Sequence, residues 1–303
     1  MLTIDAKSRG IPRLPVAALS PDVFNQRYQR PGQPVILKGL LDADVDWSLD
    51  YLCQRLGSHS FPVRCYGQRR YHQDKRRWSN IGSGADLKPM LFNDYAECLR
   101  NGQAHDQDMY LAKCPLGTTP LSLSKALRTI RDRIPLNMPV SEFNLWVGPP
   151  GHLECLHYDP MDGTLIQLHG AKKIVLFPPD QWANLYPFPT SVHLRYGRRL
   201  RCWFSQVTLQ SPDFDAFPQL REALPHRIEV ILNAGEALYI PAGWWHEVTT
   251  MGTDMACSIN RFWLVSPSRA LRSWQWWRTH LGAVYAVLYT AMGVGGLTAR
   301  DQC

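Results

Sequence analysis

The chain has 303 residues, of which 45% are hydrophobic and 19% charged, so it can bury a large core and is not a globally disordered protein. Its formal net charge of +7 allows a nucleic-acid or acidic partner but does not require one. Its eight cysteines form no Cys-x-x-Cys pair, which argues against a zinc ribbon or a thioredoxin-type site. Because the cysteines are scattered and the N-terminus lacks an apolar signal-peptide core, we expect a cytoplasmic protein.

The first part of the chain has a mixed α/β pattern. Short apolar runs predict strands at 34–41 and 109–112. Apolar residues with helical spacing predict helices at 47–56, 89–101 and 121–133. We therefore expect this part to be an α/β lead-in to a larger core.

A cluster of basic residues lies between the first two predicted helices. Its members are Arg64, Arg69, Arg70, Lys75, Arg76 and Arg77. A charge run of this kind usually covers a solvated face, which is the first interpretation. The second is a rim that binds an anionic or acidic substrate. The sequence leaves both interpretations open.

From residue 143 to residue 265 the pattern changes to short apolar strands between Gly and Pro turns. The predicted strands are 143–147, 164–168, 173–177, 227–232, 237–240, 244–248 and 256–265. No long helical pattern interrupts them, so we expect an antiparallel sandwich or barrel rather than βαβ units. The polar insertion at 186–223 has the length of a functional loop.

After Pro267 the chain is helical and rich in tryptophan, and 281–297 is almost free of charge. This apolar run is shorter than a comfortable membrane span and contains several glycines. A packing or dimerising helix is the favoured interpretation, and a membrane contact is the alternative.

Three residues form a candidate metal site. His157 and Asp159 are alternate residues on a predicted strand, so both can face one metal ion. His246, on a later predicted strand, offers a third ligand. Two histidines and one carboxylate on one side of iron(II) leave the opposite positions open for a cosubstrate and O2. A His-x-Asp pair alone is a weak signal, because a surface histidine beside a turn aspartate gives the same pattern.

Lys172 follows the predicted turn at Gly170. When 2-oxoglutarate chelates iron through one end, its other carboxylate needs a fixed cation, which Lys172 is placed to supply. Lys173 would point to the opposite face of the strand. The ordinary alternative for Lys172 is an exposed hairpin lysine.

These motifs occur in a recognisable order. They lie at 156–179, 184–187, 212–218, 237–246 and 258–263. This order resembles the JmjC (cupin-like) hydroxylase family, and in particular its small hydroxylase branch, which includes an asparaginyl hydroxylase and a wybutosine tRNA hydroxylase. The resemblance is clearest over 143–265, begins at about residue 10, and fades after 266.

The resemblance implies a mainly β fold with helical flanks and a double-stranded β-helix (cupin, jelly-roll) core. We expect an α/β lead-in at 1–110 that packs on the core, a JmjC core at 111–265, and a C-terminal helical segment at 266–303. In the asparaginyl hydroxylase the C-terminal helices dimerise, so the resemblance also implies a homodimer formed by this last segment.

Residue roles also follow from the resemblance. His157, Asp159 and His246 become the ligands of Fe(II), and Lys172 and Tyr110 bind the distal carboxylate of 2-oxoglutarate, with O2 as the second cosubstrate. Two further matches are Asn260, a pocket residue near the iron, and Trp263, a wall residue.

Two positions depart from the family pattern. Glu154 stands where many relatives have a threonine that binds 2-oxoglutarate, and Gly163 stands where many have asparagine. The carboxylate contacts are therefore expected to be partly rearranged, with Thr164 as a neighbour that compensates.

The sequence thus predicts an Fe(II)- and 2-oxoglutarate-dependent dioxygenase that hydroxylates a protein or peptide side chain. Hydroxylation of a modified tRNA nucleoside or a small molecule is the alternative, motivated by the net charge and the basic cluster. A non-enzymatic metal-binding cupin is the third reading, and the complete ligand set with Lys172 argues against it.

Overall fold

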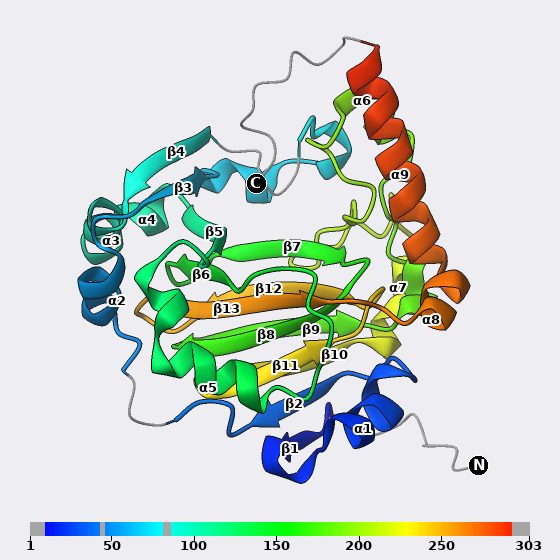
Figure 1. Ribbon diagram of the computed structural model, residues 1–303. Coiled ribbons are helices and arrows are strands. Elements are labelled where there is room, and N and C mark those ends of the chain that lie inside the picture. Colours follow the sequence, from blue (N-terminus) through cyan, green and yellow to red (C-terminus); the bar gives the residue numbers. More distant parts are fainter. Residues whose placement is uncertain (1–9, 43–45, 81–85, 293–303) are drawn as a thin grey trace.

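Two β-sheets lie face to face in the computed structural model, which describes residues 10–42, 46–80 and 86–292 (Figure 1). In spatial order, the larger sheet consists of β1 (Arg13–Pro15), β2 (Val35–Lys38), β11 (Glu236–Ile240), β8 (Asp162–His169), β13 (Ala256–Trp263), β6 (Asn144–Gly148), β5 (Met109–Pro115), β3 (Ser60–Cys65) and β4 (Asp86–Leu91). The smaller sheet consists of β10 (Ile228–Asn233), β9 (Ala171–Phe177), β12 (Trp245–Met251) and β7 (Leu153–Tyr158).

The strands from β6 to β13 form the predicted double-stranded β-helix. Along the chain they pass repeatedly from one sheet to the other, and their pairings are antiparallel. The prediction of a mainly β, jelly-roll fold is confirmed. Strands β1 to β4, from the predicted lead-in, extend the larger sheet on both sides of the β-helix strands, so lead-in and core share one sheet. The division at 110 and 265 stays a prediction, and residues 1–9 and 293–303 of its outer parts lie outside the described residues.

Helices flank the sheets (Figure 1). They are α1 (Pro21–Phe24), α2 (Leu49–Leu56), α3 (Phe92–Arg100), α4 (Gln103–Asp106), α5 (Lys125–Arg133), α6 (Val192–Tyr196), α7 (Leu220–Ala223), α8 (Pro267–Arg272) and α9 (Trp274–Ala291). Serine begins four of them: the hydroxyls of Ser20, Ser48, Ser124 and Ser273 accept a backbone N–H of the first turns of α1, α2, α5 and α9. This bond satisfies a donor that the helix itself leaves unpaired.

The predicted helix at 89–101 begins too early. Residues up to Leu91 belong to β4, and α3 starts at Phe92. The physical reason is the position of β4 at the edge of the larger sheet. Pro89 cannot donate a backbone hydrogen bond, and an edge strand tolerates that loss.

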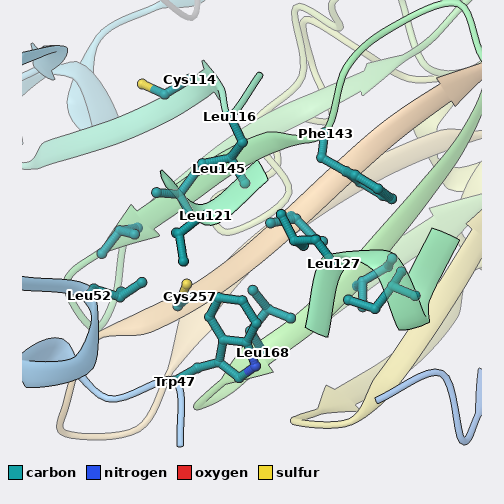
Figure 2. Close-up of a cluster of buried hydrophobic side chains, with 14 of the residues drawn as sticks. Trp47, Leu52, Cys114, Leu116, Leu121, Leu127, Phe143, Leu145, Leu168 and Cys257 are labelled. Carbon is teal, nitrogen blue, oxygen red and sulfur yellow. The ribbon is translucent and has the colours of Figure 1, made fainter. Parts of the chain in front are cut away.

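The largest hydrophobic cluster lies where helices cover the larger sheet. Figure 2 shows Leu52 of α2 and Leu127 of α5 packed near Leu145 of β6 and Leu168 of β8. A second cluster joins the two sheets from inside, with Ile174 and Leu176 of β9 against Leu238 and Ile240 of β11. Because successive strand residues face opposite sides, the even-numbered residues of β9 point between the sheets.

Helix α9 is fixed to the insertion at 186–223. The guanidinium of Arg278 donates to the backbone carbonyls of Phe188 (2.7 Å) and Cys202 (3.3 Å). Gly282 lies so close to His193 of α6 that an added Cβ would come within 2.7 Å of the imidazole. The opposite face of α9 is apolar and exposed. Within the described ranges, no helix is long and apolar enough to cross a membrane.

One fully buried carboxylate connects distant segments. Asp162, the first residue of β8, accepts two hydrogen bonds of 3.0 Å from Arg269 of α8. The same carboxylate accepts the backbone N–H of Ala242 at 2.9 Å and the amide of Gln29 at 3.5 Å. The N-terminal segment, the loop before β12 and the first helix of the C-terminal tail therefore meet at Asp162.

Replacing Asp162 with alanine should lower the free energy of unfolding by about 3–5 kcal/mol, because the Arg269 guanidinium would stay partly buried without its partner. Urea unfolding followed by tryptophan fluorescence measures this loss. The matched control is Asp50→Ala, which removes the exposed partner of Arg100 (2.7 Å) and should leave stability nearly unchanged. Similar losses in both variants would contradict the role given to Asp162.

Candidate active site

A cavity of about 120 Å³ lies between the two sheets. The smaller sheet contributes His157, Lys172 and His246 to its wall, and the larger sheet contributes Tyr110 and Asn260. Residues far apart in the sequence therefore face one partly enclosed space, as the inward side of a β-sandwich allows.

The three predicted metal ligands come together at one end of this cavity. His157 of β7 and His246 of β12 are direct partners in the sheet, and Asp159 follows immediately after β7. Ligand atoms of the three residues lie within 4.8 Å of one another, and His246 Nε2 is 3.6 Å from Asp159 Oδ2. This grouping could hold one metal ion with ligands on a single side.

The backbone orients both imidazole rings. His157 Nδ1 is 2.7 Å from the carbonyl oxygen of Cys155, and His246 Nδ1 is 3.1 Å from that of Trp244. A proton on Nδ1 donates to each carbonyl, which leaves the Nε2 lone pair of each ring for a metal. Burial, and then the charge of nearby His157, lower the pKa of His246 to about 4. His246 is therefore neutral at physiological pH, which is the form that binds metals.

Lys172 lies deep in the cavity and is 2% exposed. Its ammonium donates to the hydroxyls of Ser258 (2.6 Å) and Tyr110 (3.3 Å). Two of three N–H donors are thereby used, and the third can face a ligand. Burial lowers the pKa of Lys172 to about 8, which still leaves the amine mostly protonated at neutral pH. Among the described residues its hydrogen-bond partners are neutral hydroxyls, and a buried cation of this kind is well suited to bind a carboxylate.

The ring of Tyr110 is held from two sides. It stacks on the imidazole of His152, with centroids 3.7 Å apart, and His152 in turn contacts the carboxylate of Asp108 at 2.7 Å. On the other side, a Cβ on Gly148 would come within 2.3 Å of the ring. Glycine is therefore required at 148 for Tyr110 to reach Lys172.

Of the remaining predicted residues, Asn260 does line the cavity. Its side-chain oxygen accepts from the indole N–H of Trp146 at 2.8 Å. Lys173 lies next to Lys172 in β9, and its side chain is on the outer face of the sheet, as strand alternation predicts.

Thr164 and Trp263 lie differently from the expectation. Thr164 borders the cavity, but its side chain shares the helix-covered face of the larger sheet with Arg261, its partner in β13. Its hydroxyl accepts from the indole N–H of Trp263 at 3.2 Å, and Trp263 belongs to the large hydrophobic cluster. Trp263 is not among the described residues that line the cavity, and the Thr164 hydroxyl is directed toward Trp263, because their parity along β8 and β13 is opposite to that of Gly163 and Asn260.

The two departures from the family pattern both face the cavity. Glu154 pairs with Val248 of β12, beyond a bulge that shifts the register next to His246. One carboxylate oxygen of Glu154 is buried and has no hydrogen-bond partner among the residues that the structure describes. At Gly163 an added Cβ would meet the Phe262 ring at 3.7 Å, an ordinary contact, so glycine here leaves space rather than prevents a clash.

Among the lining or supporting residues that the sequence did not predict are Ser258, Trp146 and Arg201. Ser258 could have been found, since it alternates with Asn260 on one strand and must share its face. Arg201 lies in the insertion at 186–223, whose length was a signal, but no pattern there points to a single residue.

Comparison with known proteins identifies relatives of the whole core. The family model described as a cupin-like domain matches residues 21–269. The chain is 30% identical over 281 residues to the protein named Lysine-specific demethylase JMJ31 of Arabidopsis thaliana, which covers 81% of this chain and 48% of that protein. It is 27% identical over 259 residues to Lysine-specific demethylase 8 of Xenopus tropicalis, covering 84% and 52%.

A third relative is named Arginine-specific demethylase JMJ22 of Arabidopsis thaliana, with 24% identity over 257 residues and a coverage of 81% and 45%. The chain spans about half the length of these curated relatives. The predicted cofactors, iron(II), 2-oxoglutarate and O2, agree with this family and with the His-Asp-His cluster. The predicted resemblance is confirmed: the chain belongs to the cupin-like family, among relatives that carry the JmjC domain.

Proposed function

We propose that this protein is an Fe(II)- and 2-oxoglutarate-dependent dioxygenase that oxidises a C–H bond of a protein or peptide side chain. The observation that carries the proposal is the meeting of the three-residue metal cluster and the buried ammonium of Lys172 in one cavity. The names of relatives, lysine-specific and arginine-specific demethylases, support a protein substrate. Hydroxylation is the simplest outcome, and loss of a methyl group follows only where the oxidised carbon is bonded to nitrogen.

In this proposal each group of residues has one task. His157, Asp159 and His246 bind iron on one side. Lys172, with Tyr110 beside it, binds the distal carboxylate of 2-oxoglutarate and so fixes its orientation. The bound iron and cosubstrate supply the activation of O2, one atom of which enters the substrate C–H bond and the other succinate, with release of CO2.

The alternative of a tRNA substrate loses part of its support. Of the basic cluster at 64–77, Arg70 is turned inward, where its Nε lies 3.1 Å from Asp108. Lys75 is also buried and donates to the backbone carbonyl of Val207 at 2.6 Å. The cluster is therefore not one solvated basic face, and it offers no continuous track for phosphates. A non-enzymatic cupin would have no use for a buried lysine of this kind.

We also propose that the protein is a homodimer through α9. Five apolar residues of this helix are between 40% and 55% exposed and recur at intervals of three and four: Trp274, Trp277, Leu281, Val284 and Leu288. We call them the α9 stripe. Such spacing places them on one face, and a second copy of the same helix would bury it under two-fold symmetry. The end of the apolar run, 293–297, lies outside the described residues, and the membrane contact stays the alternative.

Substituting alanine for His157, Asp159 or His246 should abolish turnover of 2-oxoglutarate to succinate, because each change removes a ligand of the iron. Metal content after anaerobic loading with iron(II), measured by mass spectrometry, provides a readout independent of activity and should fall in each variant. His152→Ala, which changes a buried histidine outside the cluster, is the control and should keep its iron. A variant that binds iron and turns over normally would remove that residue from the ligand set.

Lys172→Ala should raise the 2-oxoglutarate concentration needed for half-maximal turnover by roughly 10- to 150-fold, because a charge-assisted contact is worth about 1.5–3 kcal/mol. Titration of succinate formation against 2-oxoglutarate measures the change. In the unaltered protein, the 2-oxoglutarate concentration needed for half-maximal turnover should also increase at pH values above about 8, because Lys172 loses its proton there.

The matched control is Lys173→Ala, which removes the neighbouring amine on the outer face of β9 and should change the requirement little. A large effect of Lys173→Ala with a small effect of Lys172→Ala would refute the placement of the cosubstrate.

Val284→Glu should convert a dimer to a monomer, because it buries a charge in the centre of the paired α9 stripes. Light scattering coupled to size exclusion measures the mass. Ala283→Glu places the same charge on an exposed position beside the stripe and should leave the dimer intact. A monomeric unaltered protein would refute the proposal, and recovery only in detergent would favour the membrane contact.

A further inference from the structure

Two arginines face the cavity beyond the cosubstrate and metal residues. Arg64 lies on β3 beside Tyr110 of β5, its partner in the sheet, and is only 7% exposed. Arg201 enters from the insertion at 186–223, with its guanidinium 5.8 Å from the centre of the Trp203 ring. The two come from segments on different sides of the fold and line the same space.

The charge of Arg64 acts on Arg201, while Arg64 itself donates to the Tyr66 hydroxyl at 3.2 Å and is attracted by Glu154. Burial lowers the pKa of Arg201, and the charge of nearby Arg64 lowers it further, whereas Glu154 and Asp159 oppose the shift. Two guanidinium groups that repel each other in a partly enclosed space are held there by the fold rather than by mutual attraction. Such a pair provides a favourable place for an anion.

Positive charge exceeds negative charge in the cavity once the cofactors of the proposed function are in place. Iron(II), Asp159, Lys172 and the two carboxylates of 2-oxoglutarate together carry no net charge. The remaining charged lining residues are the cations Arg64, Arg201 and Lys113 and the single anion Glu154. A lysine or arginine side chain that entered would add another cation in a region of low dielectric, which is unfavourable. A carboxylate that entered would reduce the excess of positive charge.

We propose that the substrate of this protein is an acidic peptide, and that Arg201 and Arg64 bind the carboxylate of an aspartate or glutamate side chain and so present the neighbouring carbon to the iron. The proposal rests on the proposed function and names its substrate class. It departs from the lysine and arginine specificity in the names of the relatives. Arg201 and Arg64 are specificity-determining residues in this assignment.

A carboxylate suits the site better than a phosphate. The planar fork of arginine pairs with a carboxylate through two parallel hydrogen bonds. Lys113 is exposed, so water screens its charge, whereas Glu154 offsets one of the two arginines. The shielded part of the site therefore matches a single negative charge better than the nearly double charge of a phosphate monoester. An RNA strand would in addition need exposed cations in a row, and Arg70 and Lys75 are buried.

Binding and turnover are tested separately. For binding, the full chain is loaded with Zn(II) and 2-oxoglutarate, a combination that cannot react because zinc has no redox chemistry. Fluorescence anisotropy is measured with labelled peptide pools that carry Asp or Glu, Asn or Gln, phosphoserine, or Lys at a central position, and with a single-stranded RNA. We expect the acidic pool to bind about 10-fold or more tightly than its amide counterpart, as for one charge-assisted contact.

Arg201→Gln should abolish this preference, and Arg201→Glu should shift it to the lysine pool. The matched control is Arg198→Gln, an exposed arginine three residues earlier, which should keep the preference. Equal or tighter binding of the lysine pool by the unaltered protein would overturn the proposal. So would an acidic preference that survives Arg201→Gln, tighter binding of phosphoserine peptides, or RNA binding that depends on Arg201.

Succinate formation with iron(II) in place of zinc then separates the two proposals. Acidic binding that depends on Arg201, without turnover under any condition, would refute the oxygenase function and leave the acidic-peptide site standing. Turnover that is not stimulated by the acidic pool would refute the acidic-peptide site and leave the oxygenase function standing.

Discussion

Burying the ammonium of Lys172 between two sheets is the constraint on which the site depends. A charge in a β-sandwich core is unfavourable unless polar groups surround it, and here the hydroxyls of Ser258 and Tyr110 do so. Tyr110 reaches Lys172 only because Gly148 leaves room for its ring and His152 stacks against the other face. The sheets, the stacked rings and a glycine thus all help to keep the Lys172 ammonium away from water, hydrogen-bonded to two hydroxyls and available to a carboxylate.

The metal cluster depends on a different constraint, the register between β7 and β12. His157 and His246 are cross-strand partners, so their rings are brought together by sheet hydrogen bonds rather than by loops. Backbone carbonyls then set the direction of each ring. The bulge immediately beyond this pair turns Glu154 into the same cavity. The regular pairing therefore sets the spacing of the two histidines, and the bulge beyond it accounts for the unusual carboxylate beside them.

Much of the candidate site could be predicted from the sequence, because the alternation of side chains along a strand determines which of them face the cavity. Because successive residues of β9 face opposite sides of the sheet, Lys172 and Lys173 are on different faces, and the His-x-Asp spacing places two candidate ligands on the same side. The same rule would have found Ser258 and would have placed Thr164 and Trp263 on the other face, had it been applied to β8 and β13. What alternation cannot supply is the bulge at Glu154 or the entry of Arg201, since both depend on contacts between segments that are distant in sequence. The edge position of β4, which permits Pro89, is likewise a property of the whole sheet.

The carboxylate of Asp162 has a consequence for the boundaries of the catalytic unit. Asp162 lies three residues after Asp159 and accepts the backbone N–H of Ala242. The neighbouring N–H of Gly243 donates to the carbonyl of Asp159 at 2.8 Å. Two hydrogen bonds therefore join the loop that carries Asp159 to the loop that leads to His246. Arg269, beyond the last strand, completes this tie from the C-terminal tail. The tail is therefore part of the support of the candidate metal ligands, and a protease that cut between β13 and α8 would weaken this support without touching His157, Asp159 or His246.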